Sequence, residues 1–249
     1  MKLEGKVCLI TGGSRGIGAA VARAMAAAGA DVSICARHDD GAASEVLSCL
    51  EHKGRRGHFV AADLRQPADA ARAVEETRDA LGSPTVLVHC AGGPVPGNVL
   101  DVSAEDWYEA FDLHIHAAFH LCRAAIPSMR SKKEGAIILV SSAAGFRGCA
   151  DATAYGVVKG ALPQFCRSLA RDFGAFNIRV NCVAPGIIRT RFQDALTPEQ
   201  VRNNIDNRIP LHREGTPEEV AEVVLMLARN DFITGETVMV DGGMTMRIA

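Results

Sequence analysis

Three polar residues, Ser142, Tyr155 and Lys159, have types and spacing that could support catalysis. Tyr155 and Lys159 lie four residues apart, and at this spacing two side chains project from the same face of a helix. Ser142 precedes the tyrosine by thirteen positions and follows the apolar run 136–140, which is typical of a buried parallel strand. Because α/β proteins bind ligands at the carboxyl ends of such strands, we expect the three side chains to converge there.

This set of side chains indicates proton transfer to or from an oxygen atom. A free tyrosine keeps its proton up to a pKa of about 10, and a neighbouring cation favours the phenolate. Lys159 is therefore expected to lower the pKa of Tyr155, while Ser142 holds the substrate oxygen. The alternative is that Tyr155 and Lys159 are an ordinary surface pair of a helix. The motifs in the rest of the chain are needed to distinguish these two interpretations.

The composition excludes several classes of protein. A chain of 249 residues, 48% of them hydrophobic, can form one large α/β domain or two small ones with a substantial core. The net charge of −2 is spread without a basic stripe, so neither a nucleic acid nor a membrane surface is expected as a partner. No apolar run is long enough to span a bilayer, and the polar segment 1–6 is not expected to be a signal peptide.

The cysteines and histidines give no metal-binding pattern. The eight cysteines never come within four residues of one another, so no C-x-x-C motif exists. Most of them lie in apolar runs, which favours reduced core residues and a cytoplasmic protein. His114 and His116 would point to different faces of a helix, and no metal site is predicted.

A glycine-rich turn at 11–18, with the sequence TGGSRGIG, follows the apolar strand 7–10. An alanine-rich helix that is expected to end at Gly29 comes after it. Glycines allow close backbone approach to a ligand, and the unpaired N–H groups of a helix N-terminus attract an anion. The order of strand, glycine turn and helix therefore predicts a phosphate-binding site.

The end of the next strand, 32–36, indicates which dinucleotide would bind. About twenty residues beyond the glycine turn, a dinucleotide-binding fold contacts the adenosine ribose, often with an acidic residue that binds the 2′-hydroxyl. This chain has Ala36 and Arg37 there, and Arg15 lies inside the turn. Two guanidinium groups suit a 2′-phosphate, which predicts NADP(H) over NAD(H). The alternative is that both arginines are solvated loop residues.

Apolar strands alternate with helices along the remaining chain, which predicts a doubly wound parallel sheet in a single domain over 1–249. Helices are expected from Pro67, from a Ser103 cap through Met129, around Tyr155, and over 217–229, with strands at 58–61, 85–88, 136–140, 179–183 and 237–240. Pro163 should kink its helix, because it removes the bond to the carbonyl of Lys159. The polar segment 187–216 is predicted to be a loop that acts as an active-site lid.

With these motifs placed, the whole chain resembles the short-chain dehydrogenase/reductase family, in particular its 3-oxoacyl-(acyl-carrier-protein) reductases and related carbonyl reductases. The resemblance rests on TG at 11–12 with GIG at 16–18, Asp63, AG at 91–92, Ser142 with Tyr155 and Lys159, Asn181 with PG at 185–186, and DGG at 241–243. It implies a Rossmann-type doubly wound fold with a seven-stranded parallel sheet flanked by helices on both faces. It also implies hydride transfer between a nicotinamide and an alcohol or carbonyl, and a homotetramer.

The resemblance also implies a role for each matching residue. Tyr155 would be the general acid in reduction and the general base in oxidation, Ser142 would fix the substrate oxygen, and Lys159 would bind the nicotinamide ribose and lower the pKa of the tyrosine. Asp63 would contact the adenine, Ala91 and Gly92 the ribose, and 185–188 with Thr190 the nicotinamide amide. The full set expected to bind the cofactor is Gly12, Ser14, Arg15, Gly16, Ile17, Gly18, Arg37, Asp63, Leu64, Ala91, Gly92, Tyr155, Lys159, Pro185, Gly186, Ile188 and Thr190.

Two positions depart from the family pattern. The family usually has Asn-Asn-Ala-Gly where this chain has HCAG at 89–92, and an asparagine in the following helix where this chain has His114. That asparagine is a proposed fourth catalytic member, which anchors a water in a proton relay from the lysine. A histidine can bind such a water through one ring nitrogen, with a different reach and tautomer. The alternative is that His114 only fills the helix face.

The substrate pocket is expected from segments 94–98, 143–150 and 187–210. Phe146, Cys149, Phe192 and Leu196 would form an apolar wall. Arg147, Arg189 and Arg191 would face water or meet an acidic substrate, and water is favoured because charged loop residues are mostly exposed.

The function these residues predict is the NADP(H)-dependent reduction of a small-molecule ketone or 3-oxoacyl group to a secondary alcohol, or the reverse. Two alternatives remain open. The first is an oxidative dehydrogenase of a sugar, steroid or other secondary alcohol, because the same residues serve both directions. The second is a catalytically weak nucleotide-binding module, suggested by the missing asparagines.

Overall fold

The computed structural model describes residues 1–39, 41–194 and 196–246, and its central element is a seven-stranded sheet. All neighbouring strands are parallel, in the order β3-β2-β1-β4-β5-β6-β7. The strand order reverses between β1 and β4, so the predicted doubly wound fold is confirmed. The strands are β1 (Val7–Thr11), β2 (Asp31–Ala36), β3 (Gly57–Ala61), β4 (Val86–His89), β5 (Gly135–Val140), β6 (Ile178–Pro185) and β7 (Thr237–Val240).

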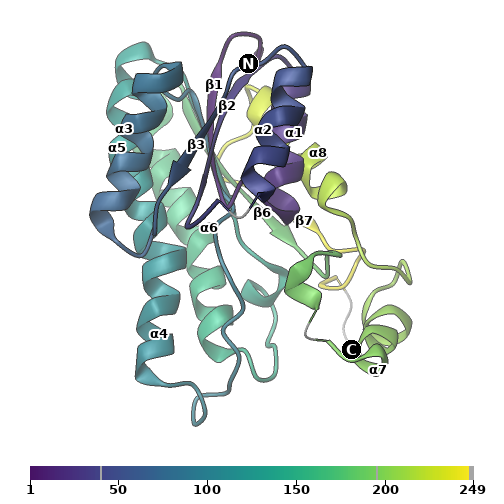
Figure 1. Ribbon diagram of the computed structural model, residues 1–249. Helices are drawn as coiled ribbons and strands as arrows, with labels where there is room; N and C mark the ends of the chain where they lie inside the picture. Colours follow the sequence, from purple (N-terminus) through teal and green to yellow (C-terminus); the bar gives the residue numbers. More distant parts are fainter. Residues whose placement is uncertain (40, 195, 247–249) are drawn as a thin grey trace.

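Helices cover both faces of this sheet (Figure 1). Helices α1, α2 and α8 pack on one face, and α3, α5 and α6 on the other. The long helices are α1 (Gly16–Ala27), α2 (Ala42–His52), α3 (Pro67–Leu81), α4 (Ala104–Phe111), α5 (Ala117–Lys132), α6 (Thr153–Phe173) and α8 (Pro217–Arg229). The short ones are α7 (Pro198–Asn203), the 3₁₀ turns η2 (Ala143–Gly145), η3 (Gly174–Phe176) and η4 (Arg191–Gln193), and the π turns η1 (Asp112–His116) and η5 (Asn204–Arg208).

Strands β1 and β5 are buried along their whole length and, apart from Thr11, carry no polar side chain, because each is covered on both faces. Successive side chains point to opposite faces of a sheet. Ile10 and Ile138 therefore join the core beneath α1 and α8, while Leu9 and Ile137 join the core beneath α3, α5 and α6. The apolar runs that identified these strands in the sequence thus supply both cores.

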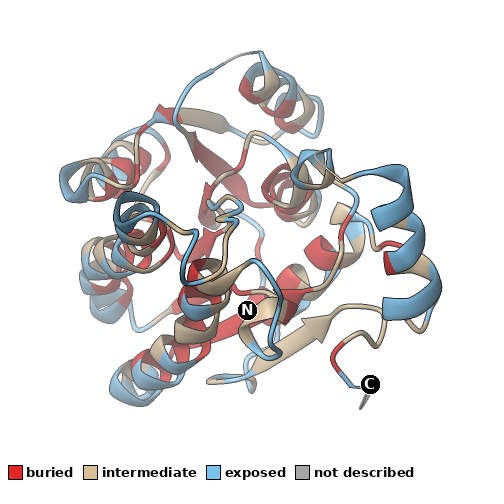
Figure 2. Ribbon diagram, turned by 90° about the horizontal axis from the view of Figure 1, so that it is seen from below, coloured by how far each residue is buried: buried red, intermediate tan, exposed pale blue. Residues whose placement is uncertain are grey.

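The carboxyl ends of the strands point downward in Figure 1, toward α4 and α7. Figure 2 views the molecule from this edge and shows buried strands at the centre with the exposed helix α7 at the rim. None of the described helices is long and apolar enough to cross a bilayer.

The helix predicted from Ser103 through Met129 differs in one respect. Its N-cap is confirmed, because the Ser103 hydroxyl accepts the N–H of Asp106 at 3.0 Å. However, the π turn η1 separates α4 from α5, and the last helical residue is Lys132. An apolar pattern of period 3.6 continues through a single π turn almost unchanged, so the sequence did not reveal it.

The prediction of a loop over 187–216 is wrong in its middle part, where η4, α7 and η5 form. Helix α7 begins at a capping box, in which Thr197 accepts from Gln200 and the Gln200 side chain accepts from the backbone of Thr197. The spacing of Thr197 and Gln200 was a sequence signal for this helix. Helix α2 was also not predicted, and α1 ends at Ala27 rather than Gly29.

Helix α6 continues through Pro163 from Thr153 to Phe173. Proline leaves the carbonyl four residues earlier without its helical N–H. That carbonyl belongs to Lys159, and it accepts the hydroxyl of Ser141 at 2.6 Å instead. The expected kink stays a prediction.

Replacing Gly18 with alanine tests how tightly the glycine turn folds onto α1. A Cβ at Gly18 would lie 2.1 Å from the carbonyl oxygen of Gly12, so the backbone would have to move. We expect Gly18→Ala to lower the free energy of unfolding in urea by about 2 kcal/mol. The control is Gly174→Ala, because a Cβ at Gly174 would meet no atom within 4 Å and should be neutral or stabilising. Equal stability of the two variants would contradict the geometry.

Candidate active site

A cavity of about 290 Å³ is lined by Ser142, Tyr155 and Lys159 together. Ser142 directly follows β5, and its hydroxyl accepts the N–H of Ala144 at 3.2 Å. Tyr155 and Lys159 lie one turn apart on α6. The structure therefore brings together the three side chains whose convergence the spacing predicts.

Lys159 is buried, and its ammonium donates a hydrogen bond to the carbonyl of Val140 at 2.8 Å. Burial lowers the pKa of Lys159 to about 8, since a charge loses its hydration there. The ammonium form is thus retained at neutral pH and lost as the pH rises through about 8.

The predicted depression of the pKa of Tyr155 is wrong. Burial of the phenol raises this pKa, and a hydrogen bond with Ser142 only partly opposes the rise. The Lys159 ammonium binds Val140 and lies 5.7 Å from the centre of the Tyr155 ring. Tyr155 therefore keeps its proton through neutral pH, as a proton donor must.

His114 lies inside the site, where the alignment with the family asparagine places it. It belongs to the π turn η1, is 1% exposed, and its Nε2 lies 3.2 Å from the carbonyl oxygen of Gly93. Its ring meets that of Tyr155 edge-on, with 5.9 Å between centroids. Its Nδ1 is buried with no hydrogen-bond partner among the described residues.

The backbone of Gly92 lies between His114 and Lys159. A Cβ placed on Gly92 would be 2.9 Å from Nδ1 of His114 and 3.5 Å from Nζ of Lys159. Burial first, and then Lys159, lower the pKa of His114 to about 2. The imidazole beside the lysine is therefore neutral.

His89 is a second buried imidazole, which the sequence showed only as a departure from the family pattern. It ends β4, and its Nδ1 lies 2.8 Å from the hydroxyl oxygen of Thr11. The same hydroxyl accepts the N–H of Ala91 at 3.2 Å. His89 and Thr11 thus join β1 to the turn after β4.

The His89 ring also faces the π turn. Burial and then Lys159 lower its pKa to about 3, while the carbonyl groups of Leu113 and His114 oppose this shift. Its Nε2 is buried without a hydrogen-bond partner among the described residues. His89 and His114 therefore form a neutral pair of rings beside the buried ammonium.

The glycine turn has the geometry of an anion site. Gly12 has a φ of +64°, which favours glycine, and the turn leads into α1 at Gly16. Helix α1 has no side-chain cap and no acidic residue in its first turn, so no carboxylate competes for its N–H groups. A dinucleotide diphosphate fits these features.

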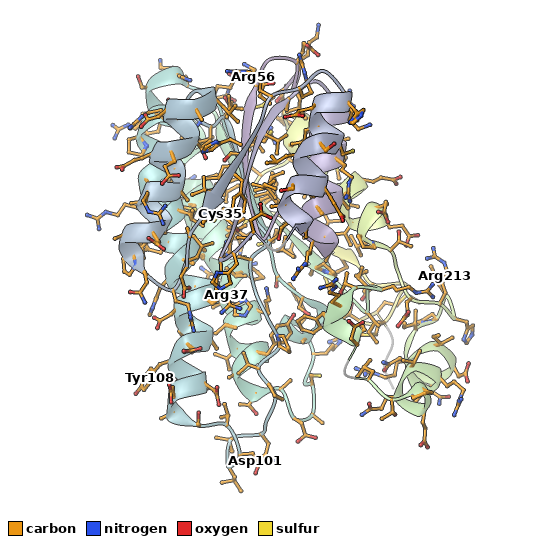
Figure 3. The ribbon with its side chains drawn as sticks, viewed as in Figure 1. Cys35, Arg37, Arg56, Asp101, Tyr108 and Arg213 are labelled. Atoms are coloured by element: carbon orange, nitrogen blue, oxygen red, sulfur yellow. The ribbon has the colours of Figure 1, made fainter. Side chains whose placement is uncertain are left out.

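The residues expected around the adenosine lie at the carboxyl edge of the sheet. Arg37 is exposed just beyond the end of β2, as Figure 3 shows. Asp63 accepts hydrogen bonds from the guanidinium group and the backbone N–H of Arg65, which lower the pKa of Asp63, and Arg37 adds a smaller effect in the same direction. The Asp63 carboxylate is thus already paired, and its contact with an adenine stays a prediction.

Residues expected near the nicotinamide lie on the same cavity as Tyr155. Thr190 directly precedes η4, and Ile188 is fixed by a β-bridge to Gly215. The predicted cofactor residues that line this cavity are Ile17, Gly92, Tyr155, Lys159, Pro185, Gly186, Ile188 and Thr190.

The predicted substrate wall is only partly correct. Cys149, Phe192 and Leu196 line the cavity, whereas Phe146 and segment 94–98 do not. Gln193, Asn204 and Arg208 also line the cavity, as expected of segment 187–210, whereas Met244 lies outside the expected segments and was missed because a tertiary contact brings it in.

The three loop arginines also have definite positions. Arg147 lines the cavity and is exposed, as expected of a residue that faces water, and it also donates two hydrogen bonds to the carbonyl of Thr245, at 2.9 and 2.7 Å. Arg189 is exposed and pairs with Glu214, and Arg191 is exposed.

Comparison with known proteins identifies the family. A family model described as enoyl-(acyl carrier protein) reductase matches residues 12–245. The 3-oxoacyl-(acyl-carrier-protein) reductase FabG of Escherichia coli K12 is 35% identical over 248 residues, 99% of this chain and 100% of that one. The chain belongs to the short-chain dehydrogenase/reductase family. It is an NAD(P)-dependent oxidoreductase of that family.

Solved structures of this family superpose along the whole chain. The L-sorbose reductase of Gluconobacter frateurii, complexed with NADPH and L-sorbose, has a TM-score of 0.92 and 32% identity, with 100% of both chains covered. A blue fluorescent protein from a metagenomic library, in complex with NADPH, has a TM-score of 0.90 and 36% identity, covering 98% of this chain and 99% of that one.

The stability of the protein in acid tests the buried state of His89. The pKa of His89 is about 3 in the folded protein, below its ordinary value of about 6.5. As the pH falls between these two values, the unfolded chain binds a proton at this histidine and the folded protein does not, so the folded protein loses stability. We expect His89→Phe to destabilise the protein at pH 7. This penalty should then shrink by up to about 1.4 kcal/mol for each pH unit below 6.

The measurement is urea unfolding of both proteins between pH 7 and 4.5. The exposed His38 provides the control, since His38→Phe should leave the pH dependence unchanged. A His89→Phe penalty that is constant with pH would contradict the buried neutral ring.

Proposed function

We propose that this protein uses NADP(H) to reduce a ketone or 3-oxoacyl group to a secondary alcohol, or catalyses the reverse reaction, with Tyr155 as the proton donor. The observation that carries the proposal is the placement of Ser142, Tyr155 and Lys159 on one cavity with the residues expected near the nicotinamide. The cofactor, when bound, supplies or accepts the hydride.

In the reducing direction, Tyr155 gives its proton to the substrate oxygen as negative charge develops there. The Ser142 hydroxyl donates a hydrogen bond to the same oxygen and holds it in place. The phenolate that Tyr155 becomes is stabilised by the Lys159 ammonium, which is charged below about pH 8. In the oxidising direction the same groups act in reverse.

The dinucleotide would be held along the carboxyl edge of the sheet. The glycine turn with Ser14, Ile17 and Gly18 would bind the diphosphate, and Lys159 the nicotinamide ribose. Arg15 and Arg37 would bind a 2′-phosphate, which favours NADP(H) over NAD(H). The two structural relatives solved with NADPH support this choice.

Three further features belong to the proposal. Residues 1–249 would form one nucleotide-binding domain that acts in the cytoplasm, which the unpaired cysteines support.

The chain would assemble as a homotetramer. Tyr108 on α4 and Phe119 on α5 are 67% and 43% exposed, and Figure 3 shows Tyr108 pointing away from the body of the molecule. Exposed aromatic residues of this kind are typical of subunit contacts.

Replacing Tyr155 with phenylalanine tests the proton donor. We expect Tyr155→Phe to lower kcat for carbonyl reduction by about a thousandfold, because general acid catalysis contributes that much. NADPH binding, followed by fluorescence titration, should change by less than threefold. The control is Tyr108→Phe, since Tyr108 is the other tyrosine of the chain and lies outside the cavity. Unchanged turnover of Tyr155→Phe would rule out the mechanism.

The pH dependence of carbonyl reduction tests the role of Lys159. As the pH rises through about 8, Lys159 loses its charge while Tyr155 keeps its proton, because the pKa of the tyrosine is raised. We therefore expect kcat/KM to fall about tenfold for each pH unit above 8. A profile that stays flat to pH 9.5 would show that the lysine charge is not required.

A further inference from the structure

One wall of the active-site cavity has a polar corner that the proposed chemistry does not use. It consists of Asn204 and Arg208 of η5, which line the cavity and are hydrogen-bonded to each other, and Gln193 of η4 also lines the cavity. We propose that this corner binds a carboxylate of the substrate, so that the preferred substrates are oxo acids and the corresponding hydroxy acids. The inference rests on the proposed function and narrows its substrate class.

Asn204 is the buried anchor of the corner. The residue is 5% exposed, and its Oδ1 accepts a hydrogen bond from Nη1 of Arg208 at 2.8 Å. Its amide nitrogen donates to no described residue and is not among the described buried atoms that lack a partner, so it is accessible. The amide therefore offers two N–H donors at the cavity wall.

Arg208 supplies a positive charge next to these donors. Its one side-chain hydrogen bond to a described residue is the one to Asn204, and it forms no ion pair with a described carboxylate. A guanidinium group carries five N–H donors in a planar fork, which matches the two oxygens of a carboxylate. Arg208 and Asn204 together can thus bind a carboxylate with several charge-assisted bonds.

The charge of the whole cavity favours an anion. The described charged residues that line it are Arg147, Lys159 and Arg208, and no Asp or Glu is among the described lining residues. Arg147 donates to the carbonyl of Thr245, and Lys159 donates to the carbonyl of Val140. Among the described cations that line the cavity, Arg208 differs because it donates to a side chain, that of Asn204, and to no backbone carbonyl. A cavity lined by one sign of charge concentrates ligands of the opposite sign.

Apolar side chains also line this cavity. The Phe192 ring lies 5.9 Å from that of Tyr155, and Leu196 and Met244 also line the cavity. A cavity of about 290 Å³ admits a small molecule. The structure thus fits a short carbon chain with a carbonyl at Tyr155 and a carboxylate at Arg208.

Matched pairs of acids and esters test this inference. NADPH oxidation is measured with 4-oxopentanoate and 5-oxohexanoate and with the methyl ester of each. We expect kcat/KM to be at least tenfold higher for the acids in the native protein. In Arg208→Gln this advantage should disappear, through a higher KM for the acids, while the esters stay within twofold. Arg191→Gln is the control, because Arg191 is exposed and lies outside the cavity lining.

Esters that are reduced as well as the acids, or an Arg208→Gln variant that loses both equally, would overturn the inference. No NADPH oxidation with any acid or ester would instead contradict the proposed function. Calorimetric titration of 4-oxopentanoate into the protein with NADP⁺ still tests the inference in that case. Weaker binding in Arg208→Gln than in the native protein would support it, and equal binding would overturn it.

Discussion

The buried ammonium of Lys159 determines how the rest of the site is arranged. The ammonium donates a hydrogen bond to the carbonyl of Val140. The backbone carbonyl of Lys159, which has no helical partner because of Pro163, accepts a hydrogen bond from the hydroxyl of Ser141. Two consecutive residues at the end of β5 thus fix one turn of α6 at two points. Tyr155 lies one turn before this contact and Ser142 directly after it, so both are positioned by the same pair of bonds. Burial of the charge has a cost, which is visible in the lowered pKa of the lysine.

The surroundings of this ammonium are neutral, and this limits which side chains can lie beside it. His89 and His114 are both kept uncharged, by burial first and by the lysine second. A charged ring at either position would repel the ammonium and lose its own hydration. The same burial raises the pKa of Tyr155, so the site holds one cation beside a protonated phenol and two neutral imidazoles. No Asp or Glu is among the described residues that line the cavity, and Arg208 adds a further positive charge to this lining.

Features of the fold and the site that depend on a local residue pattern could be predicted from the sequence. The apolar runs of β1 and β5, the glycine turn and the spacing of Tyr155 and Lys159 predicted the sheet, the anion site and the convergence of the catalytic side chains. Features that depend on tertiary contacts were missed. Spacing placed Lys159 near Tyr155 but could not show that the ammonium would bind Val140, so the predicted direction of the tyrosine pKa was wrong. The contact of Arg147 with Thr245 and the approach of Met244 to the cavity join segments that are distant in the sequence.

The account requires that Tyr155 stays protonated until the pH is well above neutral, and nuclear magnetic resonance can observe this directly. In a Tyr108→Phe variant labelled with ¹³C at the tyrosine Cζ, Tyr155 gives the one tyrosine signal. The account predicts that this signal titrates at a higher pH than that of a free tyrosine, because burial raises the pKa of Tyr155 above its ordinary value. Titration of the signal below pH 8 would contradict it.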